Sequence, residues 1–403
     1  MRALLLALLV AAASCASAQE KPPTVRPEVG KPLQAAIDAL KGKRGKEALS
    51  HARQAQEVPN KTPYETYLVT RVLGQAAAAA GEHAAAGAAL ESAAGSSSAP
   101  QGDRPQLLAV AAAQYYAAKE YGKAAAAATR YFQYGGSDKS VHTIYVQSLY
   151  LGGNYGAAAR EMASDVEAEE RAGKNPTEEQ LQLLANAYLQ SKDTAGYGRT
   201  IEKLVGYYPK KDYWQNAIYN VVTRSGFNDR LQIDVARLKF DLGLLQKADE
   251  YLDFAQLSLI EGFPAEATKV IDKGYATGAL GSGPDAARHK RLKDLAAKNL
   301  AEDRKNVLQS EKQEQAKDGK TLFNDGFNLV LYGKADKGLA MMQEGIKLGG
   351  GFRRPDHAKL QLAYAYHLAG QNDKALQMFK TVQGTDGAAA LARLWVLRLN
   401  RTS

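Results

Sequence analysis

Residues 119–125 read KEYGKAA and residues 153–159 read GNYGAAA, so two similar segments recur along the chain. Subtracting their positions gives Tyr155 − Tyr121 = 34, and the same offset of 34 separates two further pairs, Tyr116 from Tyr150 and Ala124 from Ala158. Self-similarity at a fixed period of about 20–50 residues is typical of proteins built from stacked structural repeats. We therefore expect an array of similar units, which can form one continuous body.

Each unit predicts two helices joined by a short polar turn. Small or apolar residues recur at helical spacing in the first helix, as at Leu108, Ala111 and Tyr115. The second helix repeats the pattern at Ala124 and Ala128. Only small side chains allow two helices to approach closely where they cross, so we expect Ala at the crossings. Large residues such as Tyr115 are then expected to fill the gaps between neighbouring hairpins.

These units resemble tetratricopeptide (TPR) repeats. The best match has Leu362, Ala363 and Tyr366 on a first helix, then Gly370 at the turn. Ala375 and Phe379 follow on the second helix. Other sets of residues match the same pattern: Gly74, Gly81, Ala86 and Leu90; Ala185, Tyr188, Ile201 and Pro209; Phe254, Ala255, Gly262, Ala267 and Ile271; and Gly326, Gly333, Gly338 and Met342. The resemblance covers most of residues 32–390 and implies an all-α fold, a TPR-like α-solenoid of roughly seven to nine helical hairpins.

Breaks in the repeat predict the organisation of the chain. We expect a signal peptide at 1–18, a flexible Pro-rich lead-in at 19–31 and an N-terminal TPR-like array at 32–275. A Gly-rich loop and a long charged helix are expected at 276–319, with the helix starting after Asp285 as its N-cap. A second, C-terminal TPR-like array is expected at 320–403.

The N-terminus indicates export. Residues 3–13 are an apolar run after Arg2, too short to span a bilayer, which takes about 20 residues. Small residues end this segment and predict cleavage after Ala18, which leaves Gln19 first. We expect a periplasmic or secreted protein with no transmembrane segment in the mature chain. As an alternative, a loose lipobox predicts a lipid anchor at Cys15.

Patterns typical of enzymes are absent from the sequence. The six histidines form no HExxH pair, and His357 and His367 are expected to be surface residues of helices rather than metal ligands. Residues 281–286 spell GxGxxA, but Pro284 lies inside the motif and no strand pattern precedes it. No GxSxG motif occurs, and cleavage after Ala18 would remove the single cysteine. We expect no catalytic residue, no metal and no cofactor, and therefore no enzyme.

A binding surface is the remaining expectation. In the TPR family the first helix of each hairpin lines the concave face, and its register places ten residues there: Arg71, Gln75, Gln106, Tyr116, Ser140, Gln147, Tyr150, Gln182, Asn186 and Gln190. Amides and tyrosines suit peptide backbone or sugar hydroxyls. The family's carboxylate clamp uses Lys, Asn and Arg at such positions, and here only Arg71 is cationic. Packing between hairpins is the alternative role of Tyr116 and Tyr150.

The net charge of +9 bears on which classes of binding partner are plausible. Basic residues cluster at 41–46 and at 288–293, and nucleic acid is a poor partner for an exported chain. We expect protein partners in the cell envelope, with a glycan or an anionic surface as a further candidate. A solvated helix face with mixed charges is the commonest explanation of such basic clusters. The sequence thus predicts a non-catalytic periplasmic scaffold or assembly factor, with a binder of cell-envelope glycan or peptide as the alternative.

Overall fold

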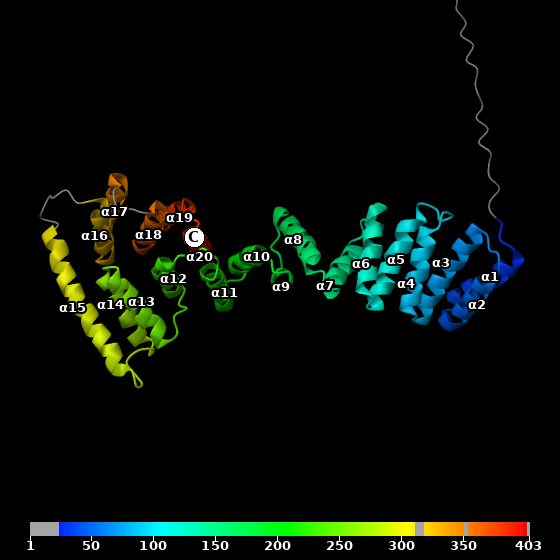
Figure 1. The fold of residues 1–403 in the computed structure, drawn as a ribbon, viewed down its shortest axis with the longest axis horizontal. Coiled ribbons are helices and arrows are strands. Elements are labelled where there is room, and N and C mark those ends of the chain that lie inside the picture. Colours follow the sequence, from blue (N-terminus) through cyan, green and yellow to red (C-terminus); the bar gives the residue numbers. More distant parts are fainter. Residues whose placement is uncertain (1–23, 311–317, 350–353, 401–403) are drawn as a thin grey trace, which may run out of the picture. The chain divides into compact units, whose positions relative to one another are not determined.

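The structure, a computed structural model, describes residues 24–310, 318–349 and 354–400. The expected signal peptide and Cys15 lie outside these residues. The chain divides into two compact units, residues 1–162 and 163–403, with the boundary inside one helix (Figure 1). Within the described residues every regular element is helical, which confirms the predicted all-α class.

Unit 1 is a row of antiparallel helical hairpins. Its helices are α1 Pro27–Lys41, α2 Gly45–Glu57, α3 Pro63–Ala80, α4 His83–Gly95, α5 Asp103–Ala117, α6 Tyr121–Gln133, α7 Lys139–Leu151 and the first part of α8 Tyr155–Arg171. The first helix begins at Pro27, inside the expected lead-in, because proline fits the first turn of a helix, where its missing N–H is not needed.

Each hairpin turns through one residue in the left-handed conformation. Eight hairpin turns in the described chain contain such a residue with positive φ, at Lys43, Gly81, Lys119, Gly153, Lys192, Gly262, Gly333 and Gly370. In the repeated pair, Lys119 has φ 61° and Gly153 has φ 79°. The next backbone N–H reaches back over the helix end, from Glu120 to Tyr115 at 2.9 Å and from Asn154 to Leu149 at 2.8 Å. This hydrogen bond satisfies a carbonyl that the helix end would leave free.

Small residues lie at the helix crossings, as predicted. Ala124 and Ala128 of α6 are fully buried where α6 packs on α5. The ring of Tyr115 lies over Gly87 of the preceding hairpin, where a Cβ would come within 2.8 Å of it. Tyr115 therefore fills the space between hairpins and prevents any larger residue at Gly87.

Unit 2 continues from α8 with hairpins and single helices. Its elements are α9 Glu178–Gln190, α10 Thr194–Tyr207, α11 Lys211–Val222, the 3₁₀ turn η1 Asp229–Leu231, α12 Gln232–Asp241, α13 Ala248–Ile260, α14 Pro264–Ala276, α15 Ala286–Ser310, α16 Gly319–Leu331, α17 Ala335–Leu348, α18 Pro355–Leu368, α19 Asn372–Lys380 and α20 Ala388–Leu399. Helix α15 is the long charged helix that the sequence predicted.

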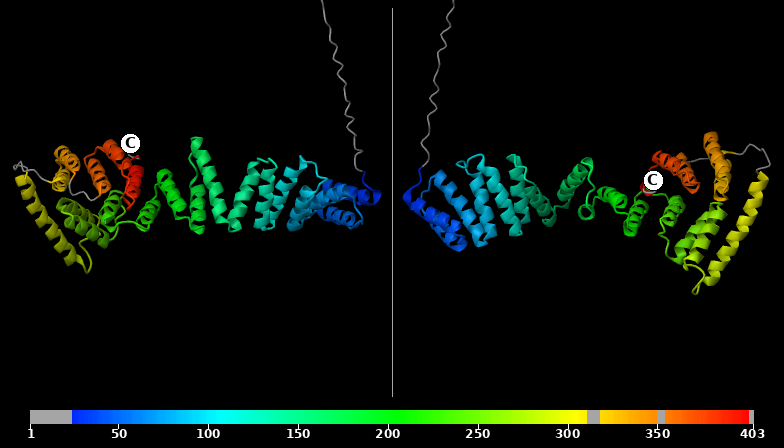
Figure 2. Two further views of the ribbon diagram at one scale, coloured as in Figure 1. Left: turned by 45° about the horizontal axis from the view of Figure 1, so that its top comes forward. Right: turned by 180° about the vertical axis from the view of Figure 1, so that it is seen from behind.

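The C-terminal helices of unit 2 fold back on its earlier helices (Figures 1 and 2). Helix α20 contacts α10, α11 and α12, and α16 contacts α14. The rings of Phe263 and Phe327 meet edge to face with their centres 4.8 Å apart. Trp395 of α20 is buried and stacks on Phe379 of α19 with ring centres 5.5 Å apart. The fold-back gives unit 2 an aromatic core formed by residues far apart in the sequence.

The length and composition of a helix decide whether it could cross a membrane. In the part of the chain that the structure describes, each helix is too short or too polar to cross a bilayer.

Candidate functional site

The first helices of unit 1 carry exposed amide side chains. Gln75 of α3, Gln106 of α5 and Gln147 of α7 are all exposed, and none of the three amides has a hydrogen-bond partner among the described residues. Helices α5 and α7 contact each other directly. We name Gln75, Gln106 and Gln147 the amide stripe. Leu151 follows Gln147 by one helical turn and is 49% exposed, so an apolar side chain lies beside the amide on α7.

Other predicted residues of unit 1 are already engaged. The guanidinium of Arg71 lies 2.9 Å from the Asp103 carboxylate, and it also donates to the hydroxyl of Tyr67. The hydroxyl of Tyr67 donates to the same carboxylate. Ser140 is exposed, and its backbone N–H is bonded to the N-cap residue Asp138. Arg71 therefore links neighbouring hairpins, which leaves it less suited to capture a partner's carboxylate.

The two repeated tyrosines are half-buried and packed. Tyr116 meets Tyr121 edge to face at 5.8 Å between ring centres, and Tyr150 meets Tyr155 in the same way at 5.3 Å. Tyr116 also packs against the core of the array. In each pair one ring ends a first helix and the other begins the second helix, so the pairs brace the hairpin turns.

In unit 2 the predicted residues lie along α9. Gln182, Asn186 and Gln190 are all exposed. The amide of Gln182 donates to the hydroxyl of Tyr213 on α11 at 2.5 Å. Tyr213 in turn donates to Glu178, whose pKa is lowered by its hydrogen bonds from Lys210 and Tyr213. Gln182 therefore takes part in the contact between α9 and α11, whereas Gln190 has no hydrogen-bond partner within the described chain.

The basic clusters differ in how far they are neutralised. At the start of α15, Lys290 pairs with Asp294 at 2.7 Å and Lys293 pairs with Asp272 at 2.9 Å. Arg288 and Arg291 are exposed without an ion pair in the described part of the chain. His289, which the sequence grouped with them, is buried and its Nδ1 accepts the N–H of Gly281. It is thus a structural residue and adds nothing to the basic surface.

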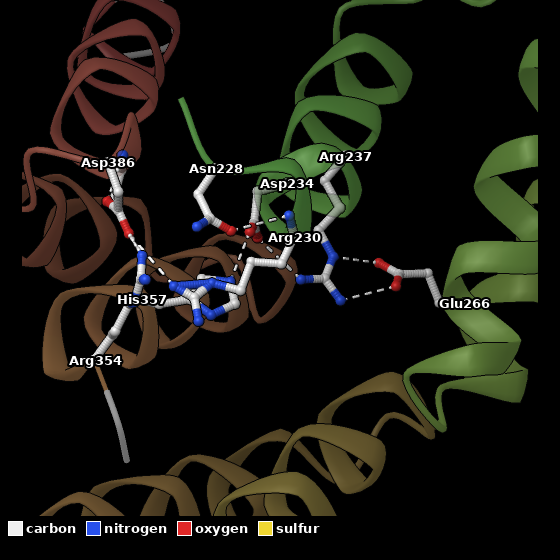
Figure 3. Close-up of polar contacts among 9 residues, drawn as sticks. Asn228, Arg230, Asp234, Arg237, Glu266, Arg354, His357 and Asp386 are labelled. Atoms are coloured by element: carbon white, nitrogen blue, oxygen red, sulfur yellow. Dashed lines mark hydrogen bonds and ion pairs between the residues drawn. The ribbon is translucent and has the colours of Figure 1, made fainter. Parts of the chain in front are cut away.

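A buried ion-pair network lies at the centre of unit 2 (Figure 3). Arg237 of α12 is 1% exposed, and its guanidinium donates to both oxygens of Glu266 on α14 at 2.9 Å. It also donates to Asp234 at 3.1 Å, and the second oxygen of Asp234 lies 2.8 Å from Nε2 of His357 on α18. The network thus joins three helices that are distant in the sequence.

Aromatic rings enclose the guanidinium. It lies 4.9 Å from the centre of the Phe327 ring and 5.2 Å from that of Tyr364. Burial by itself would lower the pKa of Arg237, but the negative charges of Glu266 and Asp234 outweigh it and hold the pKa raised. Removing one partner from a buried pair of this kind costs about 3–5 kcal/mol. Because each guanidinium nitrogen already donates to a carboxylate, we assign the network a structural role.

A second polar cluster lies at the other end of α12. His367 of α18 and Arg398 of α20 both contact the Asp241 carboxylate, at 2.9 Å each. Arg230 and Arg354 likewise share the Asp386 carboxylate. The sequence predicted that His357 and His367 are surface residues of helices rather than metal ligands; both lie on α18, but they are only 26% and 17% exposed and each contacts an aspartate. Their Asp partners are 123 and 126 residues away, so no local pattern could have identified them.

No group of His, Cys, Asp and Glu within the described ranges could hold a metal ion. No protein-family model and no curated protein matches the chain. In structure, the chain resembles tetratricopeptide repeat proteins. One from Parabacteroides merdae is 14% identical, with 67% of this chain and 99% of that one covered and a TM-score of 0.30. The TPR2AB domain of yeast Sti1, solved with pHSP90, is 12% identical, with 74% and 99% covered and a TM-score of 0.23. Yeast Tom70 is also 12% identical, with 93% and 96% covered and a TM-score of 0.25.

Proposed function

We propose that the chain is a non-catalytic scaffold or assembly factor that binds a protein partner in the bacterial cell envelope. The observation that supports this most is the amide stripe of unit 1. An amide both donates and accepts hydrogen bonds, so three unengaged amides on successive first helices suit an extended polypeptide backbone. The exposed Leu151 adds an apolar contact, which a polar stripe alone would lack.

Site-specific photo-crosslinking tests this proposal. A photoreactive amino acid at Gln147 or Gln106 is expected to capture one defined envelope protein. Ala126 is the matched control, because it is exposed on α6, the second helix of the hairpin to which Gln106 belongs. Equal capture of the same protein from Ala126 would contradict binding at the stripe.

A triple substitution, Gln75→Ala with Gln106→Ala and Gln147→Ala, tests the same surface by affinity. The partner is expected to be lost, because an extended ligand is held by several modest contacts. Surface substitutions of this kind usually change stability by less than about 0.5 kcal/mol each, so the fold is expected to survive. Unchanged affinity for the captured protein would exclude the stripe as its binding site.

A second candidate, binding of cell-envelope glycan, is supported by Tyr219 of α11. Its ring is 67% exposed, and Asn216 one turn earlier is exposed as well. A flat ring beside an amide suits a sugar, which offers an apolar face and hydroxyl groups. This candidate predicts sedimentation with a purified cell-wall fraction, and loss of sedimentation in Tyr219→Ala.

A further inference from the structure

One line of contacts in the fold-back of unit 2 carries paired aspartates and histidines, and we name it the seam. The seam consists of α12 on one side and of α18 and α20 on the other. Two aspartates of α12 each face a histidine of α18: Asp234 lies 2.8 Å from His357, and Asp241 lies 2.9 Å from His367. Both histidine side chains are largely shielded from solvent, with 26% and 17% exposed. Histidine is the side chain that ordinarily gains or loses its charge between about pH 5 and 8.

Asp234 belongs to a cluster of buried charged side chains on one side of the seam. Arg237 is shared between two buried carboxylates, those of Asp234 and Glu266. One guanidinium cannot neutralise two carboxylates. His357 also contacts this cluster, through its Nε2 at 2.8 Å from Asp234.

The groups around each histidine set the direction of the effect. Around His357 lie Asp234 of α12, Arg230 of η1, Arg354 of the loop before α18 and Asp386 of the loop before α20, with the two arginines bonded to Asp386 (Figure 3). Around His367 lie Asp241 of α12, Arg398 of α20 and the neutral groups Asn372, Tyr364 and Trp395.

The surroundings of His367 favour its charged form. Burial alone would lower its pKa, and Arg398 also lowers it, but the hydrogen bonds to Asp241 and Asn372 outweigh both and leave the pKa raised. A histidine with a raised pKa in the folded state stabilises the fold fully below its unfolded pKa of about 6.5. That contribution is lost as the pH rises through the folded pKa. The seam is therefore tighter in mild acid than in mild alkali.

We propose that the seam is a pH-sensitive latch, which holds α18 and α20 on α12 in mild acid and loosens as the pH rises through neutrality. As the pH rises, His367 loses the charge that faces Asp241, while Arg398 keeps its own. Loosening would uncover the surface of α10–α12 that α20 covers. This inference concerns unit 2 alone and does not depend on the amide stripe.

Hydrogen exchange read by mass spectrometry tests the latch in the full chain. The protection factor of an amide is its intrinsic exchange rate at a given pH divided by its observed exchange rate at that pH. The protection factor is expected to fall for α18 and α20 between pH 6 and pH 8, since the raised pKa of His367 stabilises the fold at the lower pH and this contribution is lost at the higher pH. The double variant His357→Gln and His367→Gln is expected to lose most of this fall, because glutamine keeps a hydrogen bond to each aspartate without the charge. An equal fall in the double variant, or none in the wild type, would overturn the latch.

A matched control and a second measurement complete the test. His83 of unit 1 contacts the amide of Gln114 and no carboxylate, so His83→Gln is expected to behave like the wild type. If the double variant does not fold, an NMR titration of the wild-type protein replaces it. The pKa of His367 is expected above about 6.5, the ordinary value. A pKa at or below that value would overturn the proposal.

Discussion

At the scale of single residues, the carboxylate of Glu65 in unit 1 and the guanidinium of Arg237 in unit 2 are both buried and fully partnered. Glu65 of α3 is completely buried, and its carboxylate accepts hydrogen bonds from the backbone and side chain of Arg26 and from the backbone of Thr62. Thr62 in turn caps α3, so one carboxylate completes a capping box and fixes the start of the chain to the second hairpin. Arg237 has the same function in unit 2, where it joins α12 to α14.

The substitution Glu65→Gln tests how much the buried carboxylate of Glu65 contributes to stability. Hydrogen bonds from Arg26 and Thr62 lower the pKa of Glu65 to about 2. A carboxyl with a lowered pKa stabilises the fold above its ordinary pKa of about 4.5, and the contribution is lost as the pH falls toward 2. The variant is therefore expected to unfold at lower urea concentration at pH 7 but at nearly the wild-type concentration at pH 2.5. Glu47→Gln, at an exposed pair with Arg44, is the control and should change little at either pH. A difference between Glu65→Gln and the wild type that stays constant with pH would contradict the assignment.

At the scale of helices, the sequence predicted the hairpins because their determinants are local. The offset of 34 residues identified the turns at Lys119 and Gly153, and helical spacing identified the buried face of α6. The amide stripe followed from the same register. The seam could not be predicted, because periodicity shows which face of a helix is buried but not which helix covers it. Asp241 and Arg398 are 157 residues apart, and neither belongs to a recognisable motif.

The close crossing of paired helices gives a prediction at this scale. Ala124→Leu and Ala158→Leu each insert a branched side chain where the alanine has no exposed surface. Overpacking of this kind costs typically about 1–3 kcal/mol, so each variant is expected to unfold at lower urea concentration than the wild type. Ala126→Leu is the control, because Ala126 lies on the exposed side of α6. Circular dichroism during urea titration measures all three. If Ala126→Leu were as destabilising as the other two, the crossing would not explain the repeated alanines.

At the scale of the whole molecule, both units are built from helical hairpins, but they differ in which helix surfaces are left uncovered. In unit 1 the amides of Gln75, Gln106 and Gln147 are unengaged, whereas unit 2 covers part of α10–α12 with its own α20. The binding that we propose for unit 1 and the pH response that we propose for unit 2 are therefore expected to be separable by mutation. Substitutions in the amide stripe should leave the exchange of α18 and α20 unchanged, since none of the three amides has a hydrogen-bond partner among the described residues.

Export also belongs to the scale of the whole chain. We expect intact-mass analysis of the protein from a bacterial envelope to give Gln19 as the first residue, because small residues at Ala16 and Ala18 suit signal peptidase. The helical array is expected to tolerate this cleavage, because the new end lies seven residues (26 − 19) before Arg26, which pairs with Glu65.

Two substitutions separate cleavage from lipid attachment. Ala18→Leu places a large residue at the cleavage site and is expected to leave the leader attached, with the protein held at the membrane. Cys15→Ser removes the only thiol and is expected to change neither the mass of the mature protein nor its release into the soluble envelope fraction. A lipidated protein would behave in the opposite way: its mass would include Cys15 with acyl chains, and Cys15→Ser would move it from the membrane to the soluble fraction. That result would replace the periplasmic proposal with a membrane-anchored one, and it would place the amide stripe within reach of partners at the membrane surface.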